Sequence, residues 1–347
     1  MAFEFTGFQA LDRASFDAVI DVRSPSEYAK DHVPGSMNLP VLSDEERARV
    51  GTIYVQESPF RARKIGAALV ARNVARHLEG PLAGMDGGWR PLVYCWRGGQ
   101  RSGSFATILS QVGWRAETLQ GGYRSYRRHV VDRLYYNGFS ARLILLDGNT
   151  GTAKTELLGR LAARGVQTLD LEGMANHRGS ALGAQGAQPS QKAFESRLAV
   201  ALSALNPDRP AVVEAESSRI GRLNIPPAFF TAMKAAPRIE VAAPVAARAQ
   251  YLCDAYADLI GDTELLVARL ERLTPIQGHD RVRVWCEMAR AGAHPALAEE
   301  LIRAHYDPRY AKLRGTGVEP VSLWSDTLDA TGIEALAGQI ALHVGAL

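Results

Sequence analysis

Short apolar runs alternate with amphipathic helical patterns along this chain, and the alternation begins a second time midway. In the first half these segments lie, in chain order, at 17–24, 64–78, 91–95, 102–113 and 116–122. Strands that alternate with helices usually pair side by side in parallel, so this order predicts an α/β layered domain. The restart at 142–148 predicts a second α/β domain.

The second half repeats the pattern and then becomes helical. Strands are predicted in "RLILLDG", "VQTLDLEG", "PAVVEAES" and "PRIEVAAP", and a helix is predicted at 152–165. After about residue 245 the chain is helical and rich in charge, and it closes with a small α/β segment. Two domains of ordinary size are expected for 347 residues. We place their boundary near residue 135, which gives domains 1–134 and 135–347.

Composition argues against a disulfide-rich secreted protein and against a membrane protein. The formal net charge is only +3, and three cysteines, Cys95, Cys253 and Cys286, are too few for a disulfide framework. The N-terminal segment has acidic residues and no apolar core, and no apolar run approaches the length of a membrane span. These features predict a cytoplasmic protein with no membrane partner, and they leave the oligomeric state open.

The stretch "YCWRGGQRSG" predicts a reactive thiol. A strand ends in Cys95 and gives way to a glycine-rich turn and then to a helix. Such a turn, with Gly98 and Gly99 in it, directs backbone N–H groups toward one point, and the helix adds the positive end of its dipole. Both effects, together with Arg97 and Arg101, favour a thiolate. We predict that Cys95 is a nucleophile and that the turn stabilises anionic oxygens of its substrate.

The stretch "LILLDGNTGTAKTELL" predicts a phosphate loop between a strand and a helix. It matches the pattern G-x-x-x-x-G-K-[ST], except that Ala153 replaces the second glycine. We expect Ala153 to adopt helical dihedral angles, which would leave the cradle of N–H groups intact. Lys154 is expected to reach the outer phosphates, and Thr155 to hold Mg²⁺ where it is bound. The residues predicted to surround the phosphates are Gly148, Asn149, Thr150, Gly151, Thr152, Ala153, Lys154 and Thr155.

An acidic partner for this loop is expected at the end of another strand. Glu214 and Glu216 end one predicted strand, and Asp170 and Glu172 end an earlier one; Glu214, Glu216 and Asp170 are the candidates. For each of them an exposed acid without a metal role is the alternative. No spacing of Cys and His residues indicates a transition-metal site.

The first half, roughly residues 8–128, resembles a rhodanese-like domain. The stretch "VIDVRSPSEYAKDHVPGSMNLP" carries the resemblance, which implies a sulfurtransferase fold with a persulfide or its selenium counterpart on Cys95. The spacing of Cys95 and Arg101 is Cys-x5-Arg, one residue longer than in simple sulfurtransferases. It also fits the phosphatases built on this fold, and it suits a tetrahedral anion.

Together the two halves resemble one family, the bacterial tRNA 2-selenouridine synthases. The matching motifs are "CWRGGQRS" (95–102), "DLEGMANHRGSALG" (170–183), "QPSQKAFES" (188–196), "EAESSRIGRLNIP" (214–226) and "YDPRY" (306–310). The match covers nearly the whole chain. It implies a rhodanese-like α/β domain followed by a P-loop NTPase-like α/β domain with a helical C-terminal region.

The resemblance also implies an activity. The enzyme would be a transferase that acts on tRNA with 2-thiouridine at the wobble position, where selenium from selenophosphate replaces sulfur after S-geranylation by geranyl diphosphate. A selenophosphate-producing enzyme would be the donor source, and Cys95, Arg97 and Arg101 would be catalytic. We infer that 148–155 binds the diphosphate, with Mg²⁺ as a possible partner. Whether this loop binds a nucleotide instead is left open.

Arginine and aromatic side chains commonly contact unpaired RNA bases, and the wobble base lies in such a loop. The predicted tRNA contacts are Arg124, Arg127, Arg128, His177, Arg178, Arg219 and Arg222. For 123–129 the alternative is a solvated helix face, and for the histidine and arginine of "NHRGS" it is loop capping.

Two other functions are left open. A rhodanese-type sulfurtransferase or Cys-x5-Arg phosphatase fused to a P-loop kinase explains both loops, but not the joint presence of "NHRGS" and "ESSRIG". A non-catalytic module that senses a nucleotide or RNA would have no use for the thiol of Cys95.

Overall fold

The computed structural model describes residues 2–136, 141–180, 182–184, 186–309 and 320–346. Ala181 in the motif 170–183 and Tyr310 in the motif 306–310 lie outside these residues. None of the helices in the described ranges is long and apolar enough to cross a membrane.

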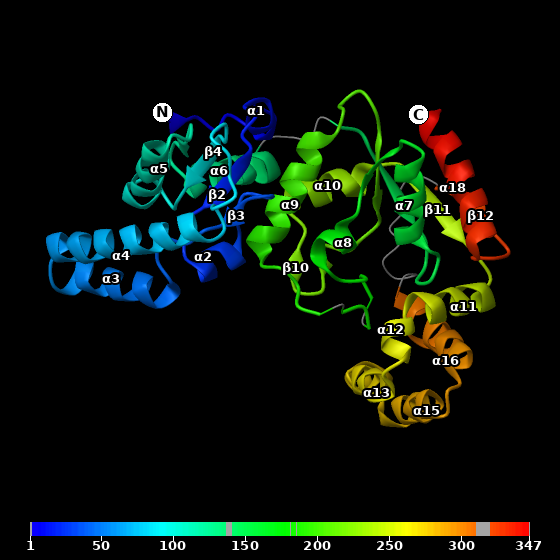
Figure 1. Ribbon diagram of the computed structural model, residues 1–347. Coiled ribbons are helices and arrows are strands. Elements are labelled where there is room, and N and C mark those ends of the chain that lie inside the picture. Colours follow the sequence, from blue (N-terminus) through cyan, green and yellow to red (C-terminus); the bar gives the residue numbers. More distant parts are fainter. Residues whose placement is uncertain (1, 137–140, 181, 185, 310–319, 347) are drawn as a thin grey trace. The chain divides into compact units, whose positions relative to one another are not determined.

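The chain forms two compact units (Figure 1). Unit 1 comprises Met1–Gly138 and Pro189–Ala204, and unit 2 comprises Phe139–Gln188 and Leu205–Leu347. A single boundary near residue 135 therefore does not describe the whole division. The segment 189–204 follows the phosphate loop in sequence, but it packs with unit 1 because its helix buries Phe194 and Leu198 there.

Unit 1 is built on a five-stranded parallel sheet in the order β1-β5-β4-β2-β3. All four residues of its middle strand β4 are buried, which explains why this strand is a continuous apolar run in the sequence. The elements of unit 1 are β1 (Ala2–Phe3), α1 (Phe8–Arg13), β2 (Ala18–Asp21), α2 (Pro25–Lys30), β3 (Met37–Asn38), α3 (Asp44–Gln56), α4 (Pro59–Glu79), β4 (Pro91–Tyr94), α5 (Gln100–Val112), β5 (Glu117–Leu119), α6 (Tyr123–Val131), the π-helical turn η1 (Asp132–Tyr136) and α9 (Gln191–Ala204).

Unit 2 has a second five-stranded parallel sheet, in the order β12-β11-β6-β8-β7. The strand before the phosphate loop, β6, is in the middle, and all five of its residues are buried. The elements of its α/β part are β6 (Leu143–Asp147), α7 (Lys154–Ala163), β7 (Gln167–Leu169), α8 (Leu171–Ala175), β8 (Ala211–Glu214), the hairpin strands β9 (Arg219–Ile220) and β10 (Leu223–Asn224), α10 (Pro227–Ala235), β11 (Arg238–Ala242), β12 (Val321–Trp324) and α18 (Ala330–Gly345).

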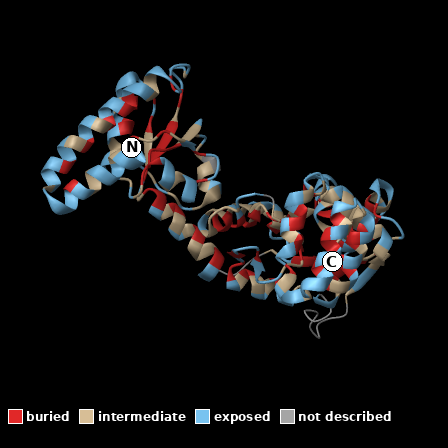
Figure 2. Ribbon diagram, turned by 90° about the horizontal axis from the view of Figure 1, so that it is seen from below, coloured by how far each residue is buried: buried red, intermediate tan, exposed pale blue. Residues whose placement is uncertain are grey.

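A group of helices in unit 2 has its own apolar core. Leu266, Trp285 and Leu301 are buried together in it, and the helices lie side by side in Figure 1. They are α11 (Val245–Ala255), α12 (Ala257–Ile260), α13 (Thr263–Glu271), α14 (Thr274–Gln277), α15 (His279–Arg290), α16 (His294–Leu301) and the π-helical turn η2 (Ile302–Tyr306). Figure 2 shows buried residues on the strands and on one side of the helices, as expected for layered packing.

The predicted α/β fold class is confirmed, and so are the main strands and helices. The runs 17–24, 91–95 and 142–148 contain β2, β4 and β6, and the pattern at 64–78 lies inside α4. The two-residue strands β1 and β3 were not predicted, since so short a segment has no detectable hydrophobic period.

Two glycines allow the loop after β4 to touch the turn after β5. Gly98 has φ +67° and Gly122 has φ +59°, a region that side chains rarely adopt. A Cβ atom on Gly98 would lie 2.6 Å from the carbonyl oxygen of Leu119, and one on Gly122 would lie 2.3 Å from that of Cys95. The contact is closed by the backbone N–H of Tyr123, which donates to the Cys95 carbonyl at 2.8 Å.

We predict that Gly98→Ala lowers the free energy of unfolding of the chain by about 2 kcal/mol or more, because strain and a backbone clash add. Gly99→Ala is the matched control, since a Cβ atom there meets nothing within 4 Å. Thermal denaturation followed by circular dichroism compares the two. Equal stability of both variants would contradict the packing described for this turn.

Candidate functional site

The Cys95 thiol lies in a nest of hydrogen-bond donors at the end of β4. The Ser102 hydroxyl donates to Cys95 Sγ at 3.2 Å, and the backbone N–H groups of Arg97, Gly99 and Ser102 also point at the sulfur. The residue is only 4% exposed. The glycine-rich turn and the first turn of α5 therefore converge on the sulfur atom.

This environment favours the thiolate. Burial alone would raise the pKa of Cys95, but the hydrogen bonds from the Ser102 hydroxyl and from the three backbone N–H groups lower it below the ordinary value. Burial raises the pKa of Cys253 and of Cys286, whose neighbouring carboxylates act in the same direction. Among the three cysteines, Cys95 is thus the one prepared for nucleophilic chemistry.

The two arginines of the loop have different positions. Arg101 forms an ion pair with Glu27 at 2.8 Å, and Glu27 also accepts a hydrogen bond from the backbone N–H of Ser24 at the start of α2. Arg97 is exposed. The main contributions that lower the pKa of Cys95 come from Ser102 and the backbone rather than from these guanidinium groups, and the sequence prediction did not include Ser102.

A buried arginine, Arg23, packs behind the Cys95 loop. Arg23 is 1% exposed; its Nε donates to Asp21 at 3.0 Å and its Nη2 to the carbonyl oxygen of Asp31 at 2.7 Å. The guanidinium also lies 4.0 Å from the centre of the Tyr123 ring. The "DVR" motif therefore provides an internal support for the turn that carries Cys95.

Helix α9 takes part in the same support. The carboxylate of Asp31 accepts hydrogen bonds from the Tyr123 hydroxyl at 2.6 Å and from the Ser196 hydroxyl at 3.0 Å. Burial raises the pKa of Asp31 in spite of these two bonds. Ser196 belongs to the motif 188–196, so part of this motif is used inside unit 1.

The phosphate loop has the backbone of an anion cradle. Gly148 and Gly151 have φ angles of +148° and +87°, and the Lys154 ammonium donates to the carbonyl oxygen of Gly148 at 2.8 Å. The expectation that Ala153 adopts helical angles is wrong, because it has φ 58° and ψ 25°. Ala153 is the N-cap of α7 and has left-handed backbone angles. An alanine in that region lowers the free energy of unfolding by roughly 1 kcal/mol relative to a glycine.

A second buried arginine holds the phosphate loop. Arg248 on α11 is 4% exposed and donates to the carbonyl oxygen of Thr150 through Nε at 2.9 Å and Nη2 at 2.7 Å. The same guanidinium binds both carboxylate oxygens of Asp307, at 2.9 and 2.7 Å. Asp307 lies in the motif 306–310, which gives this motif a structural role.

Acidic side chains gather beside the start of α7. The Thr155 hydroxyl donates to Glu172 at 3.0 Å, and the backbone N–H of Glu172 donates to Glu214 at 2.8 Å. Burial raises the pKa of Glu214 and of Glu216, and the nearby Glu172 carboxylate raises both further. Asp170 instead caps α8 by accepting from the backbone N–H of Gly173.

Glu172, on the short helix α8, is therefore the acid that contacts Thr155 of the phosphate loop. Oxygen ligands of this kind suit Mg²⁺, and the Thr155 hydroxyl with the carboxylates of Glu172 and Glu216 could supply them. Among the described residues no cluster of three or more Cys, His, Asp or Glu side chains has the arrangement of a metal site.

The predicted tRNA contacts are not equally available. Arg124, Arg128 and Arg219 are exposed. Arg127 forms an ion pair with the nearly buried Glu195 of α9, and Arg222 donates to the backbone of Gln188.

The pair His177 and Arg178 packs inside unit 2. Arg178 forms an ion pair with Asp258 at 2.9 Å and lies 4.6 Å above the Tyr256 ring. His177 is 9% exposed, and burial, with Arg269 nearby, lowers its pKa. These contacts agree with the alternative of a structural loop for "NHRGS".

A thiol in an amide nest on one parallel sheet, and a lysine-tipped phosphate loop on another, define a protein that joins a rhodanese-like domain to a P-loop domain. Family models agree: a rhodanese-like domain matches residues 8–129, and a tRNA 2-selenouridine synthase AAA domain matches residues 141–281.

Relatives with the name tRNA 2-selenouridine synthase match most of the chain. The protein of Nitrosomonas europaea is 36% identical over a match that covers 69% of this chain and 63% of that relative's length. The chain thus spans less than two thirds of this relative. The protein of Aeromonas salmonicida is 34% identical over a match that covers 84% of this chain and 86% of that relative's length. The chain therefore belongs to the tRNA 2-selenouridine synthase family, as the sequence motifs predicted.

Solved structures also show similarity. One of them is the N-terminal domain of a Clostridium difficile 630 protein described as ATP/GTP binding, with 31% identity, a TM-score of 0.32, and coverage of 38% of this chain and 99% of that one.

We predict that Ser102→Ala moves the pH profile of Cys95 alkylation to higher pH, because the thiolate loses its hydroxyl donor and its pKa rises. The thiolate fraction at neutral pH, and with it the rate of reaction with iodoacetamide, then falls. Ser104→Ala is the control, since Ser104 is exposed on the same helix. Peptide mass spectrometry separates Cys95 from the other cysteines, and an unchanged profile in Ser102→Ala would rule out this role of the hydroxyl.

Proposed function

We propose that this protein is a tRNA-modifying transferase that exchanges the sulfur of wobble 2-thiouridine for selenium. Membership of a family whose members are named tRNA 2-selenouridine synthases supports tRNA as the substrate class and selenium as the transferred element. The observation that carries the proposal is the nest around Cys95, which lowers the pKa of a thiol in the same chain as a phosphate loop.

In this proposal selenophosphate binds at the Cys95 loop. Cys95 activates the selenium donor as its nucleophile, and the exposed Arg97 binds the phosphate group as it approaches. Arg101 positions the loop through its ion pair with Glu27 rather than by touching the donor. Burial shields the Cys95 thiolate from bulk water.

The phosphate loop would bind geranyl diphosphate. Backbone N–H groups of 148–155 and the Lys154 ammonium stabilise the diphosphate as it leaves. The 2-thiouridine sulfur attacks carbon 1 of the geranyl group, the C–O bond breaks, and diphosphate departs with the bonding electrons. The base loses its N3 proton, so the product is a neutral S-alkyl group.

Alkylation prepares the base for exchange. An S-alkyl isothiourea-like carbon releases a thiolate more easily than a thione releases sulfide. The Cys95 thiolate attacks the phosphorus of selenophosphate, the P–Se bond breaks, and hydroselenide leaves with the bonding electrons and a proton. Water then hydrolyses the S–P bond, which releases phosphate and restores the thiol. The hydroselenide adds to carbon 2 of the base. Geranyl thiolate then leaves with the bonding electrons, and the proton of hydroselenide replaces the one lost from N3.

A Mg²⁺ ion bound with the diphosphate would neutralise charge on the leaving group. Thr155, Glu172 and Glu216 are the residues that would hold it. Burial, together with repulsion from Glu172, raises the pKa of Glu216, and a divalent cation would relieve this crowding of negative charge. For the tRNA we propose Arg124, Arg128 and Arg219, which are exposed.

We predict that Cys95→Ser abolishes selenium incorporation and leaves geranylation of thiolated tRNA, because the two anion sites are on different sheets. The measurement is mass spectrometry of nucleosides from tRNA incubated with the protein, selenophosphate and geranyl diphosphate. Cys286→Ala is the control for the loss of a thiol. Loss of both products in Cys95→Ser would refute the proposal that selenium incorporation and geranylation use separate sites.

We predict that Lys154→Ala lowers the rate of geranyl transfer by about 100-fold, the loss typical of one charged group that stabilises a leaving anion. Lys234→Ala is the matched control, because Lys234 is an exposed lysine of unit 2. The same nucleoside analysis gives the rates, and geranyl transfer that is unchanged in Lys154→Ala would exclude the diphosphate site.

The second candidate function is a sulfurtransferase or phosphatase fused to a P-loop kinase, which the Cys-x5-Arg spacing supports. Assays without RNA distinguish it: sulfur transfer from thiosulfate, hydrolysis of an aryl phosphate, and turnover of ATP. Robust activity in any of them would favour this alternative.

A further inference from the structure

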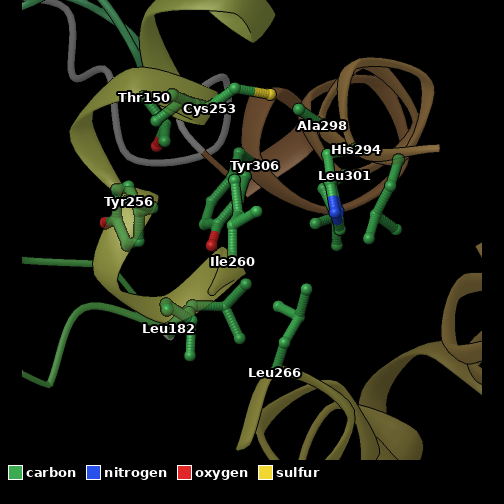
Figure 3. Close-up of a pocket in the computed structure, with 13 residues that line it drawn as sticks. Thr150, Leu182, Cys253, Tyr256, Ile260, Leu266, His294, Ala298, Leu301 and Tyr306 are labelled. Carbon is green, nitrogen blue, oxygen red and sulfur yellow. The ribbon is translucent and has the colours of Figure 1, made fainter. Parts of the chain in front are cut away.

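An apolar pocket lies in unit 2 between the phosphate loop and the helical group (Figure 3). The space inside it that the centres of water-sized molecules can occupy is about 60 Å³, several times the roughly 10–15 Å³ that one water needs. Its wall is formed mainly by aliphatic side chains of α11, α12, α13 and α16, among them Leu252, Leu259, Ile260, Leu266 and Leu301.

The chemistry of the wall suits a hydrocarbon. None of the thirteen lining residues is Asp, Glu, Lys or Arg. The hydroxyl of Tyr256 is bonded to the Ser180 hydroxyl at 2.8 Å, which leaves its ring for the pocket. A nucleotide base has polar edges that need hydrogen-bond partners, and a wall of this kind would leave most of them unpaired.

The pocket shares a wall with the phosphate loop. Thr150 lines the pocket, and its carbonyl oxygen is held by Arg248 of α11. One turn further along α11, Leu252 lines the pocket, and its Cγ lies only 3.1 Å from the position of a Cβ atom on Gly151. The pocket therefore adjoins the phosphate loop.

Two of the family motifs meet at this pocket. Leu182, from the motif 170–183, and Tyr306, from the motif 306–310, both line it. The next residue, Asp307, forms the ion pair that fixes Arg248. The motifs therefore shape the pocket and attach it to the loop.

We propose that this pocket holds the hydrocarbon chain of an allylic prenyl diphosphate whose diphosphate group lies in the loop 148–155. This inference rests on the function proposed above and adds to it the site that selects the chain. The apolar chamber provides affinity and chain-length selectivity, whereas the loop recognises only the diphosphate.

The test begins with binding of inorganic pyrophosphate, dimethylallyl diphosphate and geranyl diphosphate to the full chain by isothermal titration calorimetry. The extra isoprene unit of the geranyl donor is expected to increase affinity by about 100-fold over the dimethylallyl donor. It should also make the heat-capacity change of binding more negative, because more apolar surface is buried.

The decisive variant is Ala298→Phe, which places a ring in the pocket from α16. Affinity for geranyl diphosphate should fall at least about 10-fold, the cost of excluding part of a buried chain, while affinity for pyrophosphate stays the same. Ala296→Phe is the matched control, since Ala296 is exposed on the same helix. An equal loss for both ligands, or no loss for geranyl diphosphate, would overturn the proposal.

A second variant covers the case in which Ala298→Phe does not fold. Leu301→Ala enlarges the pocket and should raise the affinity for farnesyl diphosphate relative to geranyl diphosphate, whereas an unchanged ratio overturns the proposal. The pocket assignment and the proposed role of the phosphate loop are tested separately. If the wild-type chain binds pyrophosphate but binds geranyl diphosphate no more tightly, the pocket assignment is wrong; if it binds neither, the proposed role of the loop is wrong.

Discussion

The structure depends on one constraint, that backbone N–H groups after a buried parallel strand must find an anion or another acceptor. The strands β4 and β6 are buried along their whole length, and each is followed by a glycine-bearing turn and a helix. In the first turn the donors converge on the sulfur of Cys95. In the second the geometry forms a cradle for phosphate, with the Lys154 ammonium folded onto it. A similar local architecture therefore occurs twice in the chain with different side chains.

Each turn is supported by a buried arginine that binds oxygen atoms of the protein. Arg23 binds Asp21 and the carbonyl oxygen of Asp31, and it lies over the Tyr123 ring. Arg248 binds the carbonyl oxygen of Thr150 and the Asp307 carboxylate. Taking a guanidinium out of water is costly, and full pairing offsets that cost only when the geometry is good. What such a pair adds is a fixed position, which a nest of backbone donors needs in order to act as a preorganised site.

The helical region of unit 2 contacts the phosphate loop. Its helices carry the arginine that fixes the phosphate loop, and they line the apolar pocket beside that loop. The motifs "NHRGSALG" and "YDPRY" contribute Leu182 and Tyr306 to the pocket, while Arg178 ties the first of them to Tyr256 and Asp258. Polar residues that suggest nucleic-acid contacts in the sequence are thus partly used to build the protein itself.

The sequence by itself determined the two parallel α/β folds, the glycine-bearing turns after β4 and β6, and the family, because these depend on local period, glycine placement and short motifs. It did not determine that Ser102 donates to the thiol, that Glu172 rather than Asp170 meets Thr155, or that Ala153 lies in the left-handed region. It also could not show that α9 packs with unit 1. These features bring together residues far apart in the chain or set backbone angles by their surroundings, so only tertiary packing decides them.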